Sequence, residues 1–157
     1  MNSVCFTGHR EIKNERKLSR KLKRVLKELI KDGVTDFYAG GAIGWDMLCE
    51  QAVLKLRDKK YPDIKLHLIL PCCEEEQTLK WNSEPKNMYH KILCEADSVE
   101  FVSQHYYNGC MKKRNQRLVD FADCCICYYD KTKSASGTGQ TVRMAEKKGI
   151  NIINIHK

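Results

Sequence analysis

Short runs of β-branched, aromatic and other apolar residues alternate along this chain with longer segments in which apolar residues recur every three or four positions. The short runs predict strands at Ser3–Thr7, Thr35–Ala39, Ile64–Leu70, Ser98–Val102, Cys124–Tyr129 and Asn151–Ile155. The longer segments predict helices near Asn14–Lys31, Trp45–Lys59, Glu84–Ala96, Cys110–Ala122 and Gly139–Lys148. Such an alternation is typical of an α/β fold with a mostly parallel sheet and helices on both faces.

The first predicted helix has one apolar and one basic face. Its apolar positions follow helical spacing at Leu18, Leu22, Val25, Leu26 and Leu29. The opposite stripe carries Lys17, Arg20, Lys21, Arg24, Lys27 and Lys31. The chain as a whole has a formal charge of +8, which favours polyanionic partners. Two interpretations of the basic stripe stay open, namely contact with a nucleic-acid backbone and an ordinary solvated helix face.

The composition fits one folded domain. With 157 residues, of which 42% are hydrophobic and 31% charged, the chain can bury a core without disulfides and is too short for two full-sized domains. We therefore expect a single domain over residues 1–157. No apolar stretch approaches the roughly 20 residues that span a bilayer, and the N-terminus lacks the features of a secretory signal. These features predict a soluble cytoplasmic protein without a membrane partner.

The nine cysteines do not form a recognisable disulfide or metal-binding framework. Their number is odd and their spacing is irregular. Cys124, Cys125 and Cys127 fall inside an apolar strand, where a free thiol behaves as a small hydrophobic group. No second CxxC or HxxxH supplies the remaining ligands of a zinc site, so the sequence predicts no metal and no cofactor.

In an open parallel sheet, ligands bind beyond the carboxyl ends of the strands, where helix N-termini present unpaired N–H groups. The loop after the second predicted strand is rich in glycine and is followed by Asp46. It lacks the Lys-Ser/Thr of a phosphate-binding P-loop, so it is either a phosphate cradle or a tight turn with a helix cap. Asp46 would interact with the helix dipole, bond ribose hydroxyls or polarise a water. The candidate residues of this loop are Gly40, Gly41, Ala42, Gly44 and Asp46.

Two other loops at the same edge carry candidate anion-binding groups. After the first strand, a turn at Gly8 would place His9 and Arg10 at the mouth of the crevice, where Arg can hold a phosphate or carboxylate. Before the last helix, hydroxyl and backbone donors suit an anion, although a flexible turn has the same composition. The candidates from these two loops are Thr7, Gly8, His9, Arg10, Ser136, Gly137, Thr138 and Gly139.

Polar residues also interrupt an apolar helix and a long loop. Arg114 and Asn115 share helical stripes with apolar residues, so a buried Arg114 needs a partner in the crevice, either a ligand or a carboxylate such as Asp130. Trp81 and Asn82 would cover a base or ribose, or Trp81 would pack in the core. The aromatic segment 105–107 is either a similar lid or plain surface.

Several of these motifs, taken in order, resemble the YpsA-like branch of the SLOG superfamily. They are Val4-Cys5-Phe6-Thr7-Gly8-His9-Arg10, Gly40-Gly41-Ala42-Ile43-Gly44-Trp45-Asp46, Leu70-Pro71, Arg114-Asn115 with Leu118-Val119-Asp120, Tyr129-Asp130 and Ser136-Gly137-Thr138. The resemblance covers nearly the whole chain. It implies a Rossmann-like fold and a crevice that binds a nucleotide, a nucleotide-derived signal or single-stranded DNA.

The resemblance implies binding more directly than it implies catalysis. The related Lonely Guy phosphoribohydrolases carry Gly-Gly-x-Gly-Thr followed by glutamates, whereas this chain keeps Gly137-Thr138 without a glutamate nearby. We therefore expect a binding or sensing module for a nucleotide-derived small molecule. The alternatives are an N-glycosidic or phosphoester hydrolase, with Asp46 as base and His9 as acid or electrostatic stabiliser, and a single-stranded nucleic-acid binder of DprA type. A second copy of the chain is the remaining candidate partner.

Overall fold

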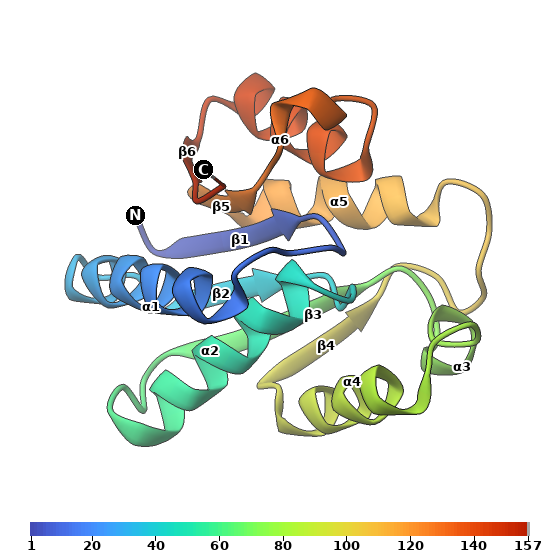
Figure 1. The fold of residues 1–157 in the computed structure, drawn as a ribbon, viewed down its shortest axis with the longest axis horizontal. Helices are drawn as coiled ribbons and strands as arrows, with labels where there is room; N and C mark the ends of the chain where they lie inside the picture. The colour runs from blue at the N-terminus through green and yellow to red at the C-terminus, as the bar shows by residue number, and fades with distance from the viewer. Residues whose placement is uncertain (157) are drawn as a thin grey trace.

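The structure is a computed structural model and describes residues 1–156. Within these residues the chain forms a six-stranded sheet in the order β4-β3-β2-β1-β5-β6 (Figure 1). The strands are β1 (Ser3–Gly8), β2 (Asp36–Ala39), β3 (Lys65–Leu70), β4 (Ser98–Phe101), β5 (Cys124–Tyr128) and β6 (Asn151–Asn154). Each neighbouring pair is parallel, so the predicted α/β class and its strands are confirmed, and the sheet is parallel throughout.

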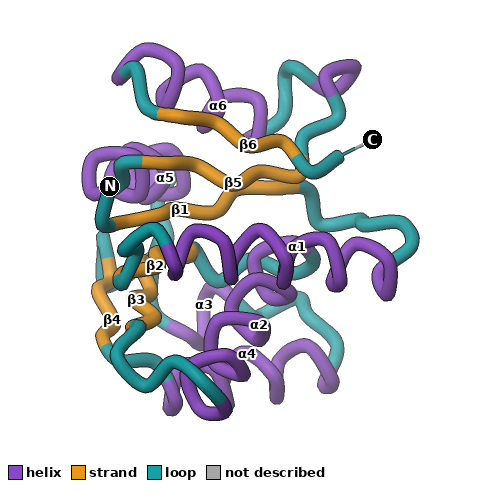
Figure 2. Tube along the Cα trace, turned by 90° about the vertical axis from the view of Figure 1, so that its left-hand side faces the viewer, coloured by secondary structure: helices purple, strands orange, loops and turns teal. Residues whose placement is uncertain are grey.

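Helices cover both faces of the sheet, as Figures 1 and 2 show. The helices are α1 (Glu15–Lys31), α2 (Trp45–Lys59), α4 (Ser83–Glu95), α5 (Cys110–Phe121) and α6 (Gly137–Lys148). Because side chains of a strand alternate between faces, Val4 and Phe6 of β1 belong to the core shared with α1, α2 and α4, whereas Cys5 belongs to the core shared with α5 and α6. The sheet therefore separates two hydrophobic cores.

The structure differs from the predicted elements mainly at short turns. It adds a four-residue helix, α3 (Glu74–Gln77), and a 3-10 turn, η1 (Lys131–Lys133), neither of which has enough residues to show helical periodicity. Helix α6 begins at Gly137 rather than near Gly139, because the Ser136 hydroxyl accepts a hydrogen bond from the Gly139 N–H at 3.1 Å and caps the helix. The loop predicted before α6 is therefore its first turn.

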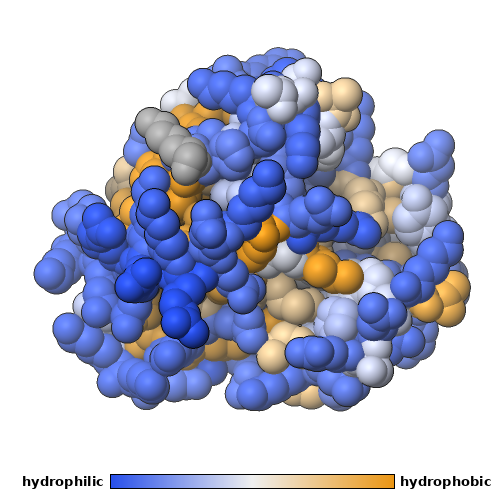
Figure 3. Space-filling model, in the orientation of Figure 1, coloured by the Kyte–Doolittle hydropathy of each residue, from blue (hydrophilic) through white to orange (hydrophobic). Residues whose placement is uncertain are grey.

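Helix α1 is amphipathic, as predicted. Leu18, Leu22, Leu26 and Leu29 are buried, and the basic residues lie on the outer side. Figure 3 shows that strongly hydrophilic side chains cover this helix. All nine cysteines are free thiols, and Cys124, Cys125 and Cys127 are buried in β5, which confirms their predicted hydrophobic role.

Candidate functional site

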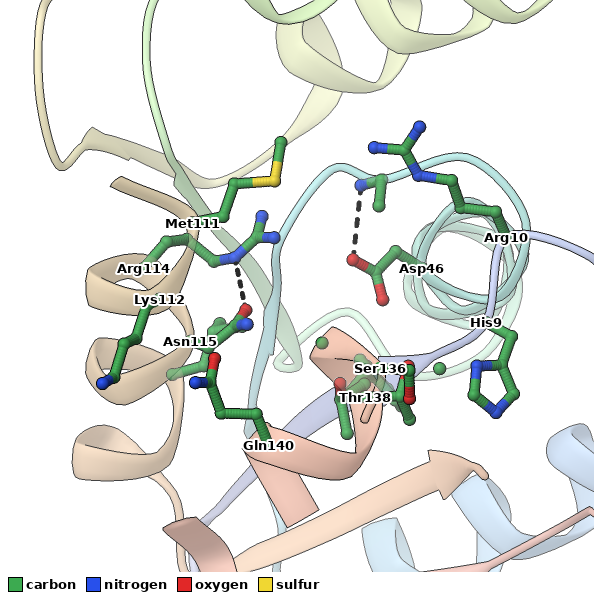
Figure 4. A pocket seen from close by; sticks show the side chains of 16 residues that line it. His9, Arg10, Asp46, Met111, Lys112, Arg114, Asn115, Ser136, Thr138 and Gln140 are labelled. Atoms are coloured by element: carbon green, nitrogen blue, oxygen red, sulfur yellow. Dashed lines mark hydrogen bonds between the residues drawn. The ribbon is translucent and has the colours of Figure 1, made fainter. Parts of the chain in front are cut away.

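The direction of strand order reverses between β1 and β5, and a cavity lies at that point. From β1 the chain adds β2, β3 and β4 on one side, whereas β5 and β6 lie on the other. Loops diverge at such a reversal and leave a crevice beyond the strand ends. The cavity here measures about 330 Å³ (Figure 4). Its lining comes from the end of β1 and the loop that follows it, from the loop after β2, from α2 and α5, and from the start of α6. It consists of Phe6, Thr7, Gly8, His9, Arg10, Ala42, Asp46, Met111, Lys112, Arg114, Asn115, Leu118, Ser136, Gly137, Thr138 and Gln140.

Most residues singled out in the sequence meet in this cavity. The structure brings together Thr7, Gly8, His9, Arg10, Ala42, Asp46, Arg114, Asn115, Ser136, Gly137 and Thr138. Gly40, Gly41, Gly44 and Gly139 are absent from its lining and lie behind it, packed against protein atoms. Trp81 and Asn82 line a neighbouring cavity of about 780 Å³, which shares Arg10 with the first.

Sequence reasoning missed some of the lining. Phe6, Met111, Lys112, Leu118 and Gln140 complete the wall. Helical spacing could have indicated two of these residues. Residues three and four apart share one face of a helix, so Met111 and Leu118 lie on the same face of α5 as Arg114. Lys112 and Gln140 are polar residues within exposed or half-buried helix turns, and their sequence context carries no comparable signal.

The glycine-rich loop donates its N–H groups to the protein's own carboxylates. The Gly41 N–H donates to Glu50 Oε2 at 3.0 Å, and the Ala42 N–H donates to Asp46 Oδ2 at 3.3 Å. One interpretation of the sequence was that this loop offers its N–H groups to a phosphate. In the structure these two N–H groups donate to Glu50 and Asp46 instead. The carboxyl oxygens of Asp46 and Glu50 therefore occupy the acceptor positions that a phosphate would take. At Gly41 and Ala42 the loop is thus a scaffold that holds two acidic side chains.

Several glycines are required by close packing. A Cβ atom on Gly8 would overlap the Trp45 side chain, and one on Gly44, whose φ is +87°, would overlap the backbone of Arg10. These contacts bring the loop after β1 and the loop after β2 together, and the Trp45 N–H donates to the His9 carbonyl at 3.2 Å. The glycines therefore shape the crevice by letting its walls approach each other.

A buried arginine, Arg114, and a buried carboxyl group, Asp46, line the cavity, and a second buried carboxyl group, Glu50, is absent from its lining. The Arg114 side chain donates from Nη1 to the Gly40 carbonyl and from Nε to Asn115 Oδ1, the latter at 2.7 Å. Arg114 therefore has protein partners in the crevice, but Asp130 is not one of them. Burial raises the pKa of Asp46 to about 6, against the opposing influence of Arg114. Burial also raises the pKa of Glu50 well above its usual range.

His9 is fixed by a backbone hydrogen bond. Its Nε2 accepts from the Asp130 N–H at 3.0 Å, which requires the neutral ring with its proton on Nδ1. Burial and the nearby Lys133 lower the pKa of His9, although Asp130 opposes this shift. A neutral ring whose Nε2 is occupied has only Nδ1–H to donate, which limits the acid role predicted for it.

The N-terminus of α6 forms another part of the wall. The Ser136 hydroxyl donates to the Lys133 carbonyl at 2.6 Å and accepts from Gly139, so both of its functions are engaged. The first N–H groups of a helix have no partner within it. Since Gly139 is satisfied by Ser136, the N–H groups of Gly137 and Thr138 are the ones this helix end offers at the cavity. A Cβ on Gly137 would meet no atom within 4 Å, so the approach is open.

Basic side chains lie at the cavity and also far from it. Arg10 and Lys112 are exposed at the rim (Figure 4). A separate groove of about 370 Å³ between α1 and α2 is lined by Lys23, Lys27, Lys55, Lys59 and Lys60, among others. Nucleic-acid binding by this basic face stays a prediction.

Together, the parallel sheet, the reversal of strand order and the cavity between helix N-termini define a Rossmann-like α/β protein with a polar crevice. Residues 5–157 match the model of the YspA SLOG family, and the chain belongs to this family. The superfamily predicted from the loop motifs is thereby confirmed.

The chain is also similar to curated proteins in sequence and to a solved structure in fold. The chain is 30% identical over 118 residues to a UPF0398 protein of Bacillus cereus strain B4264, covering 74% of this chain and 61% of that protein. It is 35% identical over 98 residues to a UPF0398 protein of Staphylococcus haemolyticus, covering 61% of this chain and 51% of that protein. The chain thus spans less than two thirds of these relatives. The X-ray structure of TM1055 matches 97% of this chain and 72% of its own, with a TM-score of 0.60 and 16% identity. Among residues 1–156, no helix combines the length and apolarity needed to cross a membrane.

Proposed function

We propose that the cavity between β1 and β5 binds a nucleotide or a nucleotide-derived anion and that the protein acts as a binding or sensing module. Membership of the SLOG family suggests a nucleotide-related role. The observation that carries the proposal is the convergence of the α6 N-terminus, Arg10 and Lys112 around one cavity. Helix N-termini and cationic side chains are the groups that hold phosphates in proteins.

The arrangement suggests an orientation for the ligand. A phosphate is expected at the N–H groups of Gly137 and Thr138, with the Thr138 hydroxyl beside it. The Asn115 Oδ1 is occupied by Arg114, so its amide NH₂ is left to donate to a ligand. Asp46 accepts hydrogen bonds from sugar hydroxyls when ionised. Arg10 at the shared rim pairs with this phosphate, and the ring of the ligand extends past it toward the second cavity, where Trp81 offers an aromatic face.

Hydrolysis is the second candidate, because one observation favours it. A carboxyl group with a pKa of about 6 at a cavity wall can take up and release a proton near neutral pH, as a general base must. Asp46 would activate water in this scheme. His9 would contribute only through Nδ1–H, since its Nε2 accepts from Asp130.

One experiment separates these functions. The protein is mixed with AMP, NAD or ADP-ribose, with inorganic phosphate alone as a reference, and the midpoint of thermal unfolding is measured while released base and phosphate are assayed. A shift with intact ligand supports the binding module. Released base or phosphate that disappears in Asp46→Asn supports hydrolysis. The proposal is contradicted if neither the three nucleotides nor phosphate shifts the midpoint of thermal unfolding.

A further inference from the structure

A thiol, a carboxylate and an imidazole converge beside the second cavity, away from the α6 N-terminus at which the phosphate is proposed to bind. Cys73 precedes α3, Glu76 lies in α3, and His105 lies in the loop after β4. The Glu76 Oε2 atom is 3.0 Å from the Cys73 Sγ and 2.7 Å from the His105 Nδ1. One ligand atom from each residue lies within 4.8 Å of the other two. All three side chains therefore meet around a single carboxylate oxygen.

We propose that Cys73, Glu76 and His105 bind a Zn²⁺ ion. Sulfur, nitrogen and oxygen from these residue types are the ligands that zinc prefers. Bond lengths of about 2.0 to 2.3 Å place the ligand atoms of a tetrahedral ion about 3.5 Å apart, so a small outward shift admits the ion. His105 can make this shift readily, because its side chain is 75% exposed.

The backbone holds the two contributing segments together. The Cys73 N–H donates to the Gln104 carbonyl at 3.2 Å, and the Tyr106 N–H donates to Glu76 Oε1 at 3.2 Å. The second bond fixes one carboxylate oxygen and leaves Oε2 facing the thiol and the imidazole. Such supporting bonds orient metal ligands in known sites.

A neighbouring cluster of the same residue types lacks this convergence. His90 contacts Glu74 through Nδ1 at 2.9 Å and Cys94 through Nε2 at 3.7 Å. The two ring nitrogens point in different directions, so the carboxylate and the thiol cannot join one of them on the same ion. Cys94 and His90 therefore serve as matched controls. All nine cysteines lie in the described residues, and Cys73 and Cys94 are the two among them that are not buried.

Three protein ligands leave one position of a tetrahedral ion open. Glu76 also lines the second cavity, together with Tyr106 and Arg10. The open position is therefore available to water or to an anionic group that enters this cavity, which makes the site an exchangeable one rather than a closed structural centre.

The test uses Co²⁺ as a spectroscopic probe for the zinc site. Co²⁺ alone is titrated into the reduced full chain, and the thiolate-to-cobalt charge-transfer band and the visible bands of tetrahedral Co²⁺ are recorded. We expect one ion per chain, displaced by Zn²⁺. Cys73→Ser should abolish the charge-transfer band, whereas His105→Asn and Glu76→Gln should weaken binding by about tenfold or more. Cys94→Ser and His90→Asn should leave the spectrum unchanged.

The variants also guard against misfolding. The His105 side chain is largely exposed, so His105→Asn keeps the fold and tests the site even if Cys73→Ser unfolds, with circular dichroism as the check. The proposal is overturned if the full chain binds neither Co²⁺ nor Zn²⁺, if a folded Cys73→Ser keeps the band, if folded His105→Asn binds as tightly as the parent, or if Cys94→Ser loses the band.

Discussion

Arg114 on α5 donates from Nη1 to the backbone carbonyl of Gly40, the residue after β2, and this contact joins the helix to the glycine-rich loop. A Cβ atom at Gly40 would lie only 2.5 Å from the same Nη1. The absence of a side chain at one residue thus decides where the buried guanidinium of the other can lie. The same absence of a side chain at Gly40 keeps Arg114 in the cavity lining, where the sequence also predicts it.

Gly40→Ala should displace Arg114 and destabilise the fold. Overpacking of a filled site costs about 1 to 3 kcal/mol, and a buried guanidinium that loses its carbonyl partner adds to that cost. Urea denaturation monitored by circular dichroism gives the free energy of unfolding. An unchanged value would show that Arg114 does not occupy this position in solution.

Gly137 and Gly139 form a matched pair in the first turn of α6. A Cβ on Gly139 would overlap the Ser134 carbonyl, whereas one on Gly137 meets no atom within 4 Å. Gly139→Ala should cost about 1 to 3 kcal/mol, and Gly137→Ala should leave stability unchanged or raise it by about 0.5 to 1 kcal/mol. The midpoints of thermal unfolding of the two variants should therefore move apart. Equal midpoints would contradict the described start of α6.

Asp46 should make the protein less stable as the pH rises from 4 to 6. Burial raises the pKa of Asp46 from 3.8 to about 6, so folding favours the protonated carboxyl. The stability it contributes is complete below pH 3.8 and is lost as the pH rises through about 6. This difference amounts to about 3 kcal/mol at most for one carboxyl group. Asp46→Asn should reduce the slope, while the raised pKa of Glu50 leaves a remainder of the same sign.

The measurement for Asp46 is the free energy of unfolding in urea at several pH values between 4 and 7. Asp130→Asn is the control, because hydrogen bonds from Thr132 lower the pKa of Asp130 and give it the opposite pH dependence. This control should keep the downward slope that Asp46 produces. Parallel curves for the parent and Asp46→Asn would show that Asp46 is ionised as readily in the folded chain as in the unfolded one.

Arg10→Ala should weaken the binding of AMP under the proposed function. Arg10 lies at the rim shared by both cavities and is exposed, so its removal should spare the fold. A charge-assisted contact to phosphate contributes about 1.5 to 3 kcal/mol, which predicts a dissociation constant higher by about 10- to 100-fold in calorimetry. Arg16→Ala removes the same charge from an exposed position on α1, away from the cavity lining, and should leave the affinity within about twofold. Equal losses in both variants would indicate attraction by net charge rather than binding at the cavity.

The strands, helices and location of the crevice could be predicted from the sequence. Alternating Val4, Cys5 and Phe6 define a strand buried on both faces, and the leucines of α1 define the buried side of a helix, because hydrophobic periodicity is a local property. Since parallel strands end at one edge, the residues that follow β1 and β5 were also bound to meet there. Arg10 and Thr138, which follow these two strands in the sequence, accordingly line one cavity.

Only the tertiary structure decided which groups face each other within that frame. The sequence presented Gly41 as a phosphate donor, but the turn of α2 brings Glu50 to its N–H. Likewise, Cys73 and His105 are far apart in the chain and meet because β3 and β4 are paired in register. Hydrophobic patterning fixes the elements through local burial, whereas hydrogen-bond partners and ligand sets depend on strand register and loop path, which arise from contacts across the whole fold.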